Sequence, residues 1–332
     1  MSSTTAFGID IGGSGIKGAP VDLKAGELAA DRLRIPTPQP STPEAVADTV
    51  KELLDSFGVE RGMPVGVTFP AVIQHGVAKT AANVDKSWID TDADALFTER
   101  TGHDVFVVND ADAAGISEME FGAGRGTTGV VLMTTLGTGV GSALFVDGRL
   151  VPNSELGHIP FHGDAAEKYM AESVREREDL DWKAWAGRLQ EYYSLLEFLF
   201  NPDLFIVGGG VSKHHAKFLP LLDLRAPIVP ADLRNEAGII GAAVLARRAE
   251  DETRAAASGK GRKKSGIAAE KAEAKLEKKS EKAAKKAGKS ADKAAKNADK
   301  ATKKADKKAD KNADNNADKK AKSSKTSTSK KK

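Results

Sequence analysis

Glycine-rich turns follow strand-like runs at three places in the chain. They are Asp10–Lys17, Leu136–Gly141 and Gly208–Ser212. Because glycine has no side chain, the backbone N–H groups of such turns can approach an anion closely, which suits the binding of phosphate groups. A single turn of this kind is more often structural, but three of them, with Asp10 and Lys17 in the first, favour a site for a phosphate donor.

The first turn also contains the spacing Gly-x-Gly-x-x-Gly over residues 13–18, which formally matches a dinucleotide-binding fingerprint. That fingerprint requires a turn that opens a helix. Here Pro20 and Val21 follow, and the region reads as a second strand. The turn at residues 137–141 likewise leads into a strand-like run, Ser142–Val146. We therefore reject the fingerprint and interpret both turns as the tips of β-hairpins.

Asp110 is the best candidate for a general base. It follows an apolar strand-like run, Val105–Val108, and lies at the start of a predicted helix over residues 109–121. The dipole of a helix favours a carboxylate at that end, and a positioned carboxylate can accept a proton from a hydroxyl group. These residues alone are equally consistent with a carboxylate that only caps the helix.

The elements that would position these groups alternate between strand and helix, which predicts an α/β fold. One helix begins at Pro43 after a capping Thr42 and ends before Gly58. Apolar residues at helical spacing predict further helices over residues 182–200 and 236–248. The predicted strands are residues 6–11, 65–72, 105–108, 129–136, 142–146 and 204–207.

The charge of the 332 residues is divided between an acidic body and a basic end. Residues 255–332 carry 27 Lys and Arg and 10 Asp and Glu, a net charge of +17, whereas residues 1–254 carry a net charge of −14. All aromatic side chains lie at or before Phe218. Residues 251–332 therefore cannot build a core, and we predict a low-complexity Lys/Ala/Asp tail that is disordered or transiently helical. Such a tail could bind polyanions without specificity.

Composition excludes several classes of site and protein. The chain has no cysteine, which excludes disulfides, a thiolate nucleophile and zinc sites that need cysteine ligands. Residues 1–5 do not resemble a secretory signal, and no apolar run approaches the ~18 residues that span a bilayer. We expect a cytoplasmic protein without a membrane segment.

Several spaced motifs resemble those of a known family. The turns at residues 10–17, 137–141 and 208–210 resemble the phosphate and adenosine motifs of the two-domain actin/hexokinase/Hsp70-like ATPase fold, which is ribonuclease H-like. Asn109–Ala114 and Glu155–His158 look like motifs of the ROK sugar kinases. Thr68–Val72 and Thr80–Trp88 are closer still to the polyphosphate glucokinases within that family, and the resemblance covers roughly residues 6–248.

The resemblance implies a kinase that transfers the terminal phosphoryl group of inorganic polyphosphate, with ATP as a second donor, to the 6-hydroxyl group of glucose. It also implies Mg²⁺ and a homodimer. One alternative is a strictly ATP-dependent glucokinase or glucomannokinase. The alternative of another class is a sugar-binding regulator whose basic tail contacts nucleic acid.

The motifs suggest a division of the chain after residue 108. We expect a small α/β domain over residues 1–108, completed by the C-terminal helix at 236–250, and a large α/β domain over residues 109–235. The tail at residues 251–332 has no counterpart in the core of the family.

The resemblance assigns a role to each position that matches a motif. Asp110 is the catalytic base toward the sugar 6-hydroxyl, and Asp10 holds Mg²⁺ through water. The residues implied to contact the sugar are Asn83, Asn109, Asp110, Glu155, His158 and Glu167. The residues implied to face the donor phosphates are Asp10, Gly12, Gly13, Ser14, Lys17, Gly137, Thr138, Gly139, Gly209 and Gly210.

One feature of many ROK kinases is missing from this chain. These kinases bind zinc through a Cys-x-Cys cluster and the histidine of the Gly-His pair, but this chain has no cysteine. We therefore predict no zinc site and a role for His158 in sugar contacts alone. The other histidines are expected to be structural, including the neighbours His214 and His215, which lack a third ligand.

Overall fold

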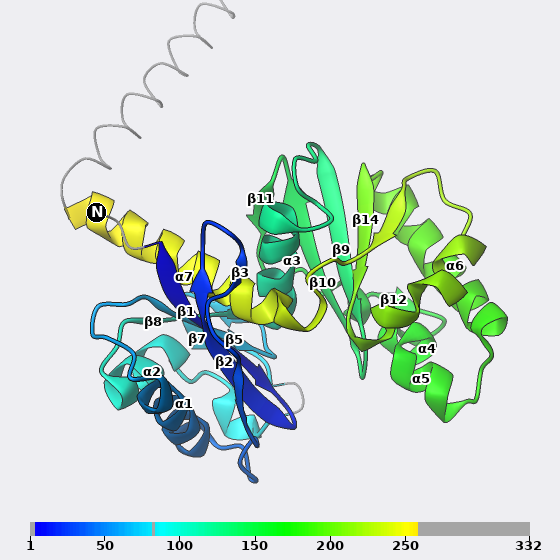
Figure 1. The fold of residues 1–332 in the computed structure, drawn as a ribbon. Coiled ribbons are helices and arrows are strands. Elements are labelled where there is room, and N and C mark those ends of the chain that lie inside the picture. The colour runs from blue at the N-terminus through cyan, green and yellow to red at the C-terminus, as the bar shows by residue number, and fades with distance from the viewer. Residues whose placement is uncertain (1–3, 82–83, 258–332) are drawn as a thin grey trace, which may run out of the picture. The chain divides into compact units, whose positions relative to one another are not determined.

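Two mixed β-sheets with the same strand pattern form the framework of the described residues (Figure 1). The structure is a computed structural model that describes residues 4–81 and 84–257. In each sheet a central strand runs antiparallel to the strand that follows it and parallel to its neighbour on the other side. This arrangement confirms the predicted α/β class.

The first sheet has the order β3-β2-β1-β5-β8, and β4 also pairs with β2. Its strands are β1 (Thr5–Gly12), β2 (Gly15–Asp22), β3 (Glu27–Leu28), β4 (Leu33–Ile35), β5 (Val65–Phe69) and β8 (Val105–Asn109). The second sheet has the order β11-β10-β9-β14-β15. Its strands are β9 (Val130–Leu136), β10 (Val140–Val146), β11 (Arg149–Val151), β14 (Leu204–Gly208) and β15 (Ile228–Pro230). We call the parts built on these sheets the first and the second lobe.

Both glycine-rich turns that were predicted to be hairpin tips are hairpin tips. Gly12 of β1 pairs with Gly15 of β2, so residues 13 and 14 form the first tip. Leu136 of β9 pairs with Val140 of β10, so residues 137–139 form the second. Because neither turn opens a helix, the rejection of a dinucleotide fingerprint is confirmed.

Helices α1 (Pro43–Phe57) and α2 (Ala93–Thr101) pack with the first sheet in one apolar core. Helix α1 begins and ends where the sequence predicts. Thr42 Oγ1 accepts a hydrogen bond from a backbone N–H of the first turn (3.4 Å), and Gly58 adopts the left-handed conformation with φ of 57°. Trp88 of the 3₁₀ helix η1 (Lys86–Trp88) is fully buried in the same core.

Helix α6 (Trp182–Phe200) supplies much of the core of the second lobe. Its residues Trp185, Leu189 and Tyr193 are fully buried. The Tyr193 hydroxyl forms a hydrogen bond with Thr134 Oγ1 of β9 (2.6 Å), so its polar end has a partner inside the core. The short helices α4 (Glu167–Met170) and α5 (Glu172–Arg177) pack beside α6 (Figure 1).

Helices α3 (Asp110–Phe121) and α7 (Ala237–Ala257) share an apolar core with residues of both sheets (Figure 1). Helix α7 crosses the first sheet at Gly8 and Gly66, where a Cβ atom would collide with carbonyl groups of the helix. Gly241 of α7 lies equally close to the backbone of α3. These three glycines therefore let backbone pack directly on backbone, and they fix α3 and α7 relative to the first sheet.

The remaining elements are short, and some differ from the predicted bounds. The strand predicted over residues 65–72 ends at Phe69, because Pro70 cannot donate to the ladder. The last helix extends to Ala257, beyond the predicted end at residue 248. The short elements are β6 (Ile73–Gln74), β7 (Val77–Ala78), η1 (Lys86–Trp88), η2 (Leu156–His158), β12 (Pro160–Phe161), β13 (Asp164–Ala165), α4 (Glu167–Met170), α5 (Glu172–Arg177), η3 (Gly210–Lys217), η4 (Leu219–Leu221) and η5 (Arg234–Glu236).

Two predictions lie outside the described residues: the sugar-contact residue Asn83 and the tail from residue 258 onward. The division into domains after residue 108 stays a prediction, and residues 1–254 form one compact unit by their contacts. No helix of the described ranges is long and apolar enough to cross a membrane.

We predict that Gly8→Ala lowers the free energy of unfolding by about 2 kcal/mol or more, because overpacking a tight contact commonly costs about 1–3 kcal/mol. Gly187→Ala is the matched control. Gly187 is exposed in α6, and nothing lies within 4 Å of the position that its Cβ would take. This control should raise stability by about 0.5–1 kcal/mol. Urea unfolding measures both variants, and similar effects in the two would contradict the packing role of Gly8.

Candidate active site

The carboxyl ends of the parallel strands β1, β5 and β8 bring three polar residues together. Asp10 lies near the end of β1, Thr68 near the end of β5, and Asn109 at the end of β8. The Thr68 hydroxyl donates a hydrogen bond to Asp10 Oδ1 (2.8 Å). Ligand sites of α/β sheets typically lie at this edge.

Asp10 has close neighbours on two further sides. Lys17 is its register partner on β2, and its Nζ lies 3.7 Å from Asp10 Oδ2. Gly238 lies in the first turn of α7, where a Cβ atom would be 3.2 Å from Asp10 Oδ1. The Lys17 side chain is 30% exposed and the Asp10 side chain 24%, so both can still meet a ligand.

Asn109 performs the capping of α3, which leaves Asp110 available for chemistry. Asn109 Oδ1 accepts hydrogen bonds from the N–H groups of Ala111 (2.9 Å) and Asp112 (3.1 Å). Its Nδ2 donates to the carbonyl oxygen of Ala71 (3.0 Å). Asp110 Oδ1 accepts one hydrogen bond, from the N–H of Ala111 (2.8 Å). Asn109, and not Asp110, is therefore the cap of α3, and the alternative that Asp110 serves only as the helix cap loses its basis.

The surroundings of Asp110 make it a stronger base than an ordinary carboxylate. Although the residue is exposed at the surface, the protein around its carboxylate weakens hydration and raises its pKa to about 6. The charges of Asp10 and Glu155 add to this rise, and the hydrogen bond from Ala111 opposes it. A carboxyl group with this pKa is mostly ionised at pH 7 and suited to accept a proton.

The hairpin tip at residues 137–139 is held in shape by the start of α5. The N–H of Gly137 donates to the carbonyl oxygen of Gly139 (3.0 Å). Ser173 donates through its N–H to the Gly137 carbonyl (3.1 Å) and through its hydroxyl to the Thr138 carbonyl (2.6 Å). A Cβ at Gly139 would be 2.5 Å from Glu167 Oε2, so glycine permits this close approach.

The third glycine-rich turn lies beside the second. Gly209 has φ of 83°, and a Cβ there would collide with the backbone of Leu136, directly before the second tip. Gly210 begins η3. Near the same tip, Gly141 of β10 lies close to Ala111 in the first turn of α3. The turns of the second lobe therefore meet near the start of α3.

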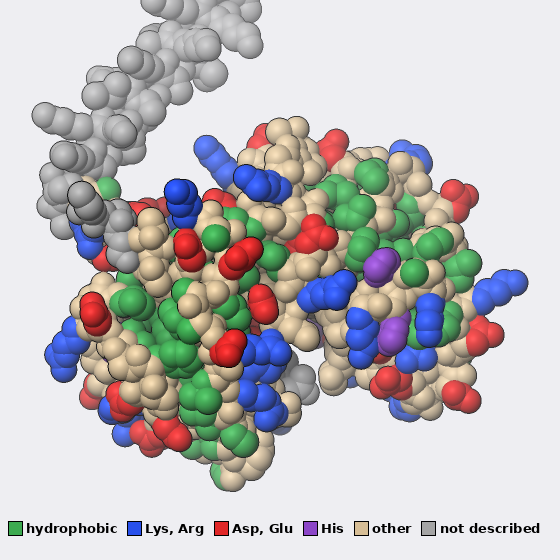
Figure 2. Space-filling view, in the orientation of Figure 1, with side chains coloured by type: hydrophobic (Ala, Val, Ile, Leu, Met, Phe, Trp, Pro, Cys, Tyr) green, Lys and Arg blue, Asp and Glu red, His purple; other side chains and the backbone are tan. Residues whose placement is uncertain are grey.

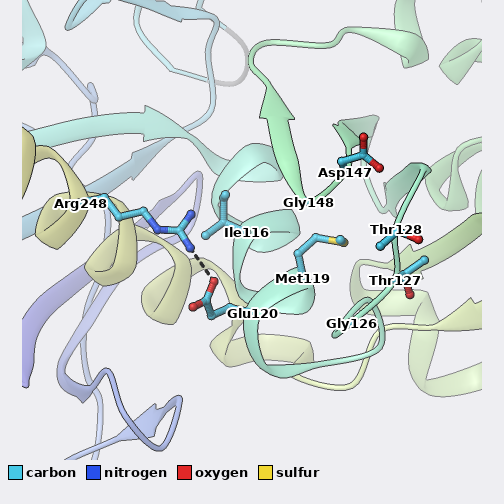
Figure 3. A pocket seen from close by; sticks show the side chains of 9 residues that line it. All are labelled: Ile116, Met119, Glu120, Gly126, Thr127, Thr128, Asp147, Gly148 and Arg248. Carbon is cyan, nitrogen blue, oxygen red and sulfur yellow. Dashed lines mark hydrogen bonds and ion pairs between the residues drawn. The ribbon is translucent and has the colours of Figure 1, made fainter. Parts of the chain in front are cut away.

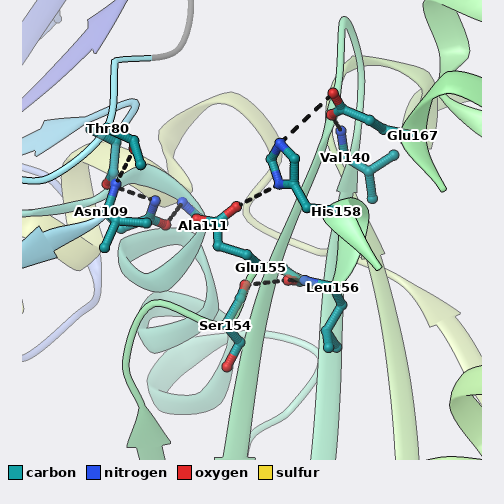
Figure 4. Close-up of polar contacts among 12 residues, drawn as sticks. Thr80, Asn109, Ala111, Val140, Ser154, Glu155, Leu156, His158 and Glu167 are labelled. Carbon is teal, nitrogen blue, oxygen red and sulfur yellow. Dashed lines mark hydrogen bonds and ion pairs between the residues drawn. The ribbon is translucent and has the colours of Figure 1, made fainter. Parts of the chain in front are cut away.

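His158 lies between two carboxylates (Figure 4). Its Nδ1 is 3.0 Å from Glu155 Oε2, and its Nε2 is 3.9 Å from Glu167 Oε1. Glu167 Oε2 also accepts a hydrogen bond from the N–H of Val140 (3.2 Å). These side chains supply both donors and acceptors, as the recognition of hydroxyl groups requires.

The turn that carries Glu155 and His158 is fixed to β10. The Ser142 hydroxyl donates to the carbonyl oxygen of Ser154 and accepts a hydrogen bond from the N–H of Leu156 (2.9 Å). Gly157 lies against the backbone of Val140, where a Cβ would collide with the carbonyl oxygen. Glu155 and His158 thus lie on a turn that contacts with β10 hold in place.

Asp112 is a residue near the site that sequence reasoning missed. It is 1% exposed; its Oδ2 accepts a hydrogen bond from the N–H of Asn153 (2.7 Å), and its Oδ1 has no partner among the described residues. Asn153 in turn bonds the N–H (2.9 Å) and the carbonyl oxygen (2.8 Å) of Ile73, which links the two lobes. Burial raises the pKa of Asp112 to about 7. The only signal in the sequence is the second aspartate of the run Asn109–Asp112.

Three of the remaining histidines have side-chain contacts of their own. The His214 ring lies 5.6 Å from the Trp182 ring, and His215 Nδ1 is 3.0 Å from the Ser212 carbonyl oxygen. His162 Nε2 lies 2.8 Å from Glu191 Oε2. Within the described ranges, no group of three or more His, Asp and Glu residues is arranged to hold a metal ion.

A depression of about 280 Å³ lies at the other end of α3 (Figure 3). Arg248 and Glu120 form an ion pair at its side (2.5 Å). Its lining residues are Ile116, Met119, Glu120, Gly126, Thr127, Thr128, Asp147, Gly148 and Arg248. None of them is a predicted site residue, so this depression is separate from the candidate active site.

Comparison with known proteins matches this geometry to a family. Residues 6–174 match the ROK family. The polyphosphate glucokinase of Mycobacterium tuberculosis (strain CDC 1551 / Oshkosh) is 51% identical over 239 residues, which cover 72% of this chain and 89% of that protein. The polyphosphate glucokinase of Mycobacterium leprae (strain TN) is 47% identical over 239 residues, 72% of this chain and 73% of that protein.

Solved structures extend the comparison to the fold. The inorganic polyphosphate/ATP-glucomannokinase of Arthrobacter sp. strain KM is 56% identical, with a TM-score of 0.70, and the match covers 74% of this chain and 98% of that one. A ROK family glucokinase from Streptomyces griseus, solved with glucose and AMPPNP, shares the fold at 24% identity and a TM-score of 0.63 over 74% of this chain and 99% of that one. This chain belongs to the ROK family. Its duplicated sheets are those of the ROK sugar kinases, as the sequence motifs predict.

We predict that Asp112→Asn removes part of the pH dependence of stability. Asp112 has a pKa of about 7 in the folded protein and about 3.8 when unfolded, so its ionisation opposes folding as the pH rises through this range. The free energy of unfolding of the variant, relative to that of the parent, should therefore increase by roughly 2–4 kcal/mol between pH 5 and pH 8. Urea unfolding at the two pH values measures the difference. A difference that is the same at both would contradict the raised pKa.

Proposed function

We propose that this chain is a glucokinase that transfers the terminal phosphoryl group of inorganic polyphosphate, and of ATP, to the 6-hydroxyl group of glucose. The observation that carries the proposal is the Asp110 carboxylate, which is not used as a helix cap and whose pKa is raised by weakened hydration and by the charges of Asp10 and Glu155. Relatives that are 51% and 56% identical are named polyphosphate glucokinase and polyphosphate/ATP-glucomannokinase, which supports both donors.

We propose that glucose binds between Asp110 and His158. Asn109, Glu155, His158 and Glu167 would hold the sugar hydroxyl groups by hydrogen bonds. Asn83 is proposed for the same role, although it lies outside the described residues. Asp110 would accept the proton of the 6-hydroxyl as its oxygen attacks the donor phosphorus.

The donor would lie across the hairpin tips, where backbone N–H groups and Lys17 can face its charge. The proposed donor-binding residues are Asp10, Gly12, Gly13, Ser14, Lys17, Gly137, Thr138, Gly139, Gly209 and Gly210. Figure 2 shows lysine and arginine side chains on both sides of the hollow between the two lobes, which suits an anionic donor. 

Mg²⁺ is proposed as the metal of the reaction. The Asp10 carboxylate accepts a hydrogen bond from Thr68 and its side chain is still 24% exposed, which fits a cation that keeps most of its waters and takes few protein ligands. When bound, Mg²⁺ would neutralise charge on the donor phosphates. Because the chain has no cysteine, we propose no zinc site.

We predict that Asp110→Asn lowers kcat by about a hundredfold or more, because the amide cannot accept the proton and general-base catalysis is typically worth about 10²–10⁴ in rate. The dissociation constant of glucose, measured by calorimetry, should change little, since the amide keeps the shape of the side chain. A variant that retains more than about a third of the turnover would show that Asp110 is not the base.

A coupled assay for glucose 6-phosphate, run with each donor, separates the alternatives. Product from ATP alone would favour a strictly ATP-dependent glucokinase. No product from either donor, together with glucose binding, would favour a sugar-binding regulator. We also propose a cytoplasmic homodimer, and sedimentation velocity of the full-length chain tests the dimer.

We predict that the basic tail captures the polyphosphate donor. The chain up to residue 254 carries a net charge of −14 and residues 255–332 carry +17, so the tail could attract a polyanion that the body repels. Removal of residues 258–332 should raise the KM for long-chain polyphosphate, leave the KM for glucose unchanged and flatten the salt dependence of the polyphosphate KM. Unaltered polyphosphate kinetics at low salt would exclude this role and favour nucleic-acid anchoring.

A further inference from the structure

A row of charged side chains crosses three strands of the first sheet. Asp10 on β1 pairs with Lys17 on β2, and Lys17 pairs with Arg34 on β4. Residues paired across antiparallel strands project from the same face. Because neighbouring strands lie about 4.8 Å apart, the backbone positions of Asp10 and Arg34 are separated by roughly 10 Å across the sheet.

This row lies on the face of the sheet that carries the first turn of α7. Gly8, two residues before Asp10, packs against the backbone of α7, and Asp10 itself lies beside Gly238. The opposite face is covered by α1, whose buried residues pack with Ile9 and Ile11. Asp10, Lys17 and Arg34 therefore share the face on which the donor is proposed to bind.

Arg34 is seated over the first hairpin tip. Its Nη2 donates a hydrogen bond to the carbonyl oxygen of Ser14 (2.6 Å). A Cβ at Gly15 would be 2.5 Å from Arg34 Nε and 2.6 Å from Arg34 Cζ. Gly15 does not have a positive φ, so its backbone conformation is open to other residues. An alanine at this position would therefore displace the guanidinium of Arg34 rather than strain the backbone.

The Arg34 guanidinium has further N–H groups that could bind a ligand. Arg34 is exposed and, in the part of the chain that the structure describes, forms no ion pair and no side-chain hydrogen bond beyond the one to Ser14. A guanidinium presents several N–H groups in a planar fork that matches two phosphate oxygens. Arg34 can therefore bind a phosphate group while it remains bonded to the hairpin tip.

The surface beyond this row is unsuited to a polyanion. A depression of about 1020 Å³ is lined by residues 26–32, directly before β4, and by residues 232–236. Within it, Arg32 donates a hydrogen bond to the carbonyl oxygen of Asn235 (3.3 Å). The depression is lined by four carboxylates against two arginines: Glu27, Asp31, Asp232 and Glu236 against Arg32 and Arg234. Arg34 is therefore the outermost cation of the row before the surface becomes acidic.

We propose that Arg34 binds the polyphosphate donor at a phosphate remote from the transferred group, with Gly15 providing its seat. The proposal rests on the proposed function and names a subsite of the same donor site. A donor must be long enough to reach from Asp10 to Arg34 to gain this contact. The subsite therefore favours long polyphosphate chains over short donors.

The test compares Arg34→Gln with Arg149→Gln in the full-length chain. Arg149 is an exposed arginine on β11 of the second sheet and serves as the matched control. Initial rates are measured with long-chain polyphosphate, tripolyphosphate and ATP. Arg34→Gln should raise the KM for long chains about tenfold, as expected for a charge-assisted contact, and change the other donor KM values less than about twofold. The glucose KM and all constants of Arg149→Gln should match the parent.

A second variant tests whether Gly15 positions the Arg34 guanidinium. Gly15→Ala should push the guanidinium away and raise the KM for long chains in the same direction. The double variant Gly15→Ala/Arg34→Gln should be no worse than Arg34→Gln alone, because both changes remove one contact. Additive effects would show that Gly15 acts independently of Arg34. Thermal unfolding checks that each variant remains folded.

Binding of labelled long-chain polyphosphate to the same full-length variants gives a readout without turnover. If the parent forms no glucose 6-phosphate from polyphosphate, yet Arg34→Gln binds it more weakly than Arg149→Gln, the proposed function fails and the subsite stands. Equal KM and equal binding in Arg34→Gln and Arg149→Gln would overturn the subsite. An equal rise of KM for all three donors would also overturn it, because the contact would then not depend on chain length.

Discussion

The Asp110 carboxylate lies near the charges of two other carboxylates, those of Asp10 and Glu155, and the described structure holds the three groups together. Weakened hydration, together with the charges of Asp10 and Glu155, raises the pKa of Asp110 to about 6. Each of the three is fixed by a different element: β1, the first turn of α3, and the turn before η2. The basicity of Asp110 therefore depends on how closely the elements of the two lobes are packed.

Backbone contacts provide this packing. Helix α7 touches the first sheet at Gly8 and Gly66, and α3 lies against Gly241 of α7. A larger residue at these points would separate the backbones and with them the carboxylates. The link from Asp112 through Asn153 to the first lobe adds a polar connection at the same junction. The same contacts thus serve both the stability of the fold and the placement of these carboxylates.

The sequence predicts what depends on local signals. Thr42 and Gly58 define the ends of α1, and short glycine turns followed by strand-like residues define the hairpin tips. The catalytic and sugar-contact roles were carried over from family motifs rather than from spacing, and they remain proposals. The environment of Asp112 and the seat of Arg34 could not be predicted, because each depends on a partner that only the fold brings near: Asn153 lies 41 residues from Asp112, and Ser14 lies 20 residues from Arg34.

The pH dependence of kcat/KM for glucose, with saturating polyphosphate and Mg²⁺, tests the central claim most directly. This parameter reports the ionisation of the essential base in the enzyme before glucose binds. If neighbouring carboxylates and weakened hydration make Asp110 the base, kcat/KM should be level above pH 7 and fall tenfold per pH unit below about pH 6. An acid limb near pH 4, the range of an ordinary carboxyl group, would contradict the account.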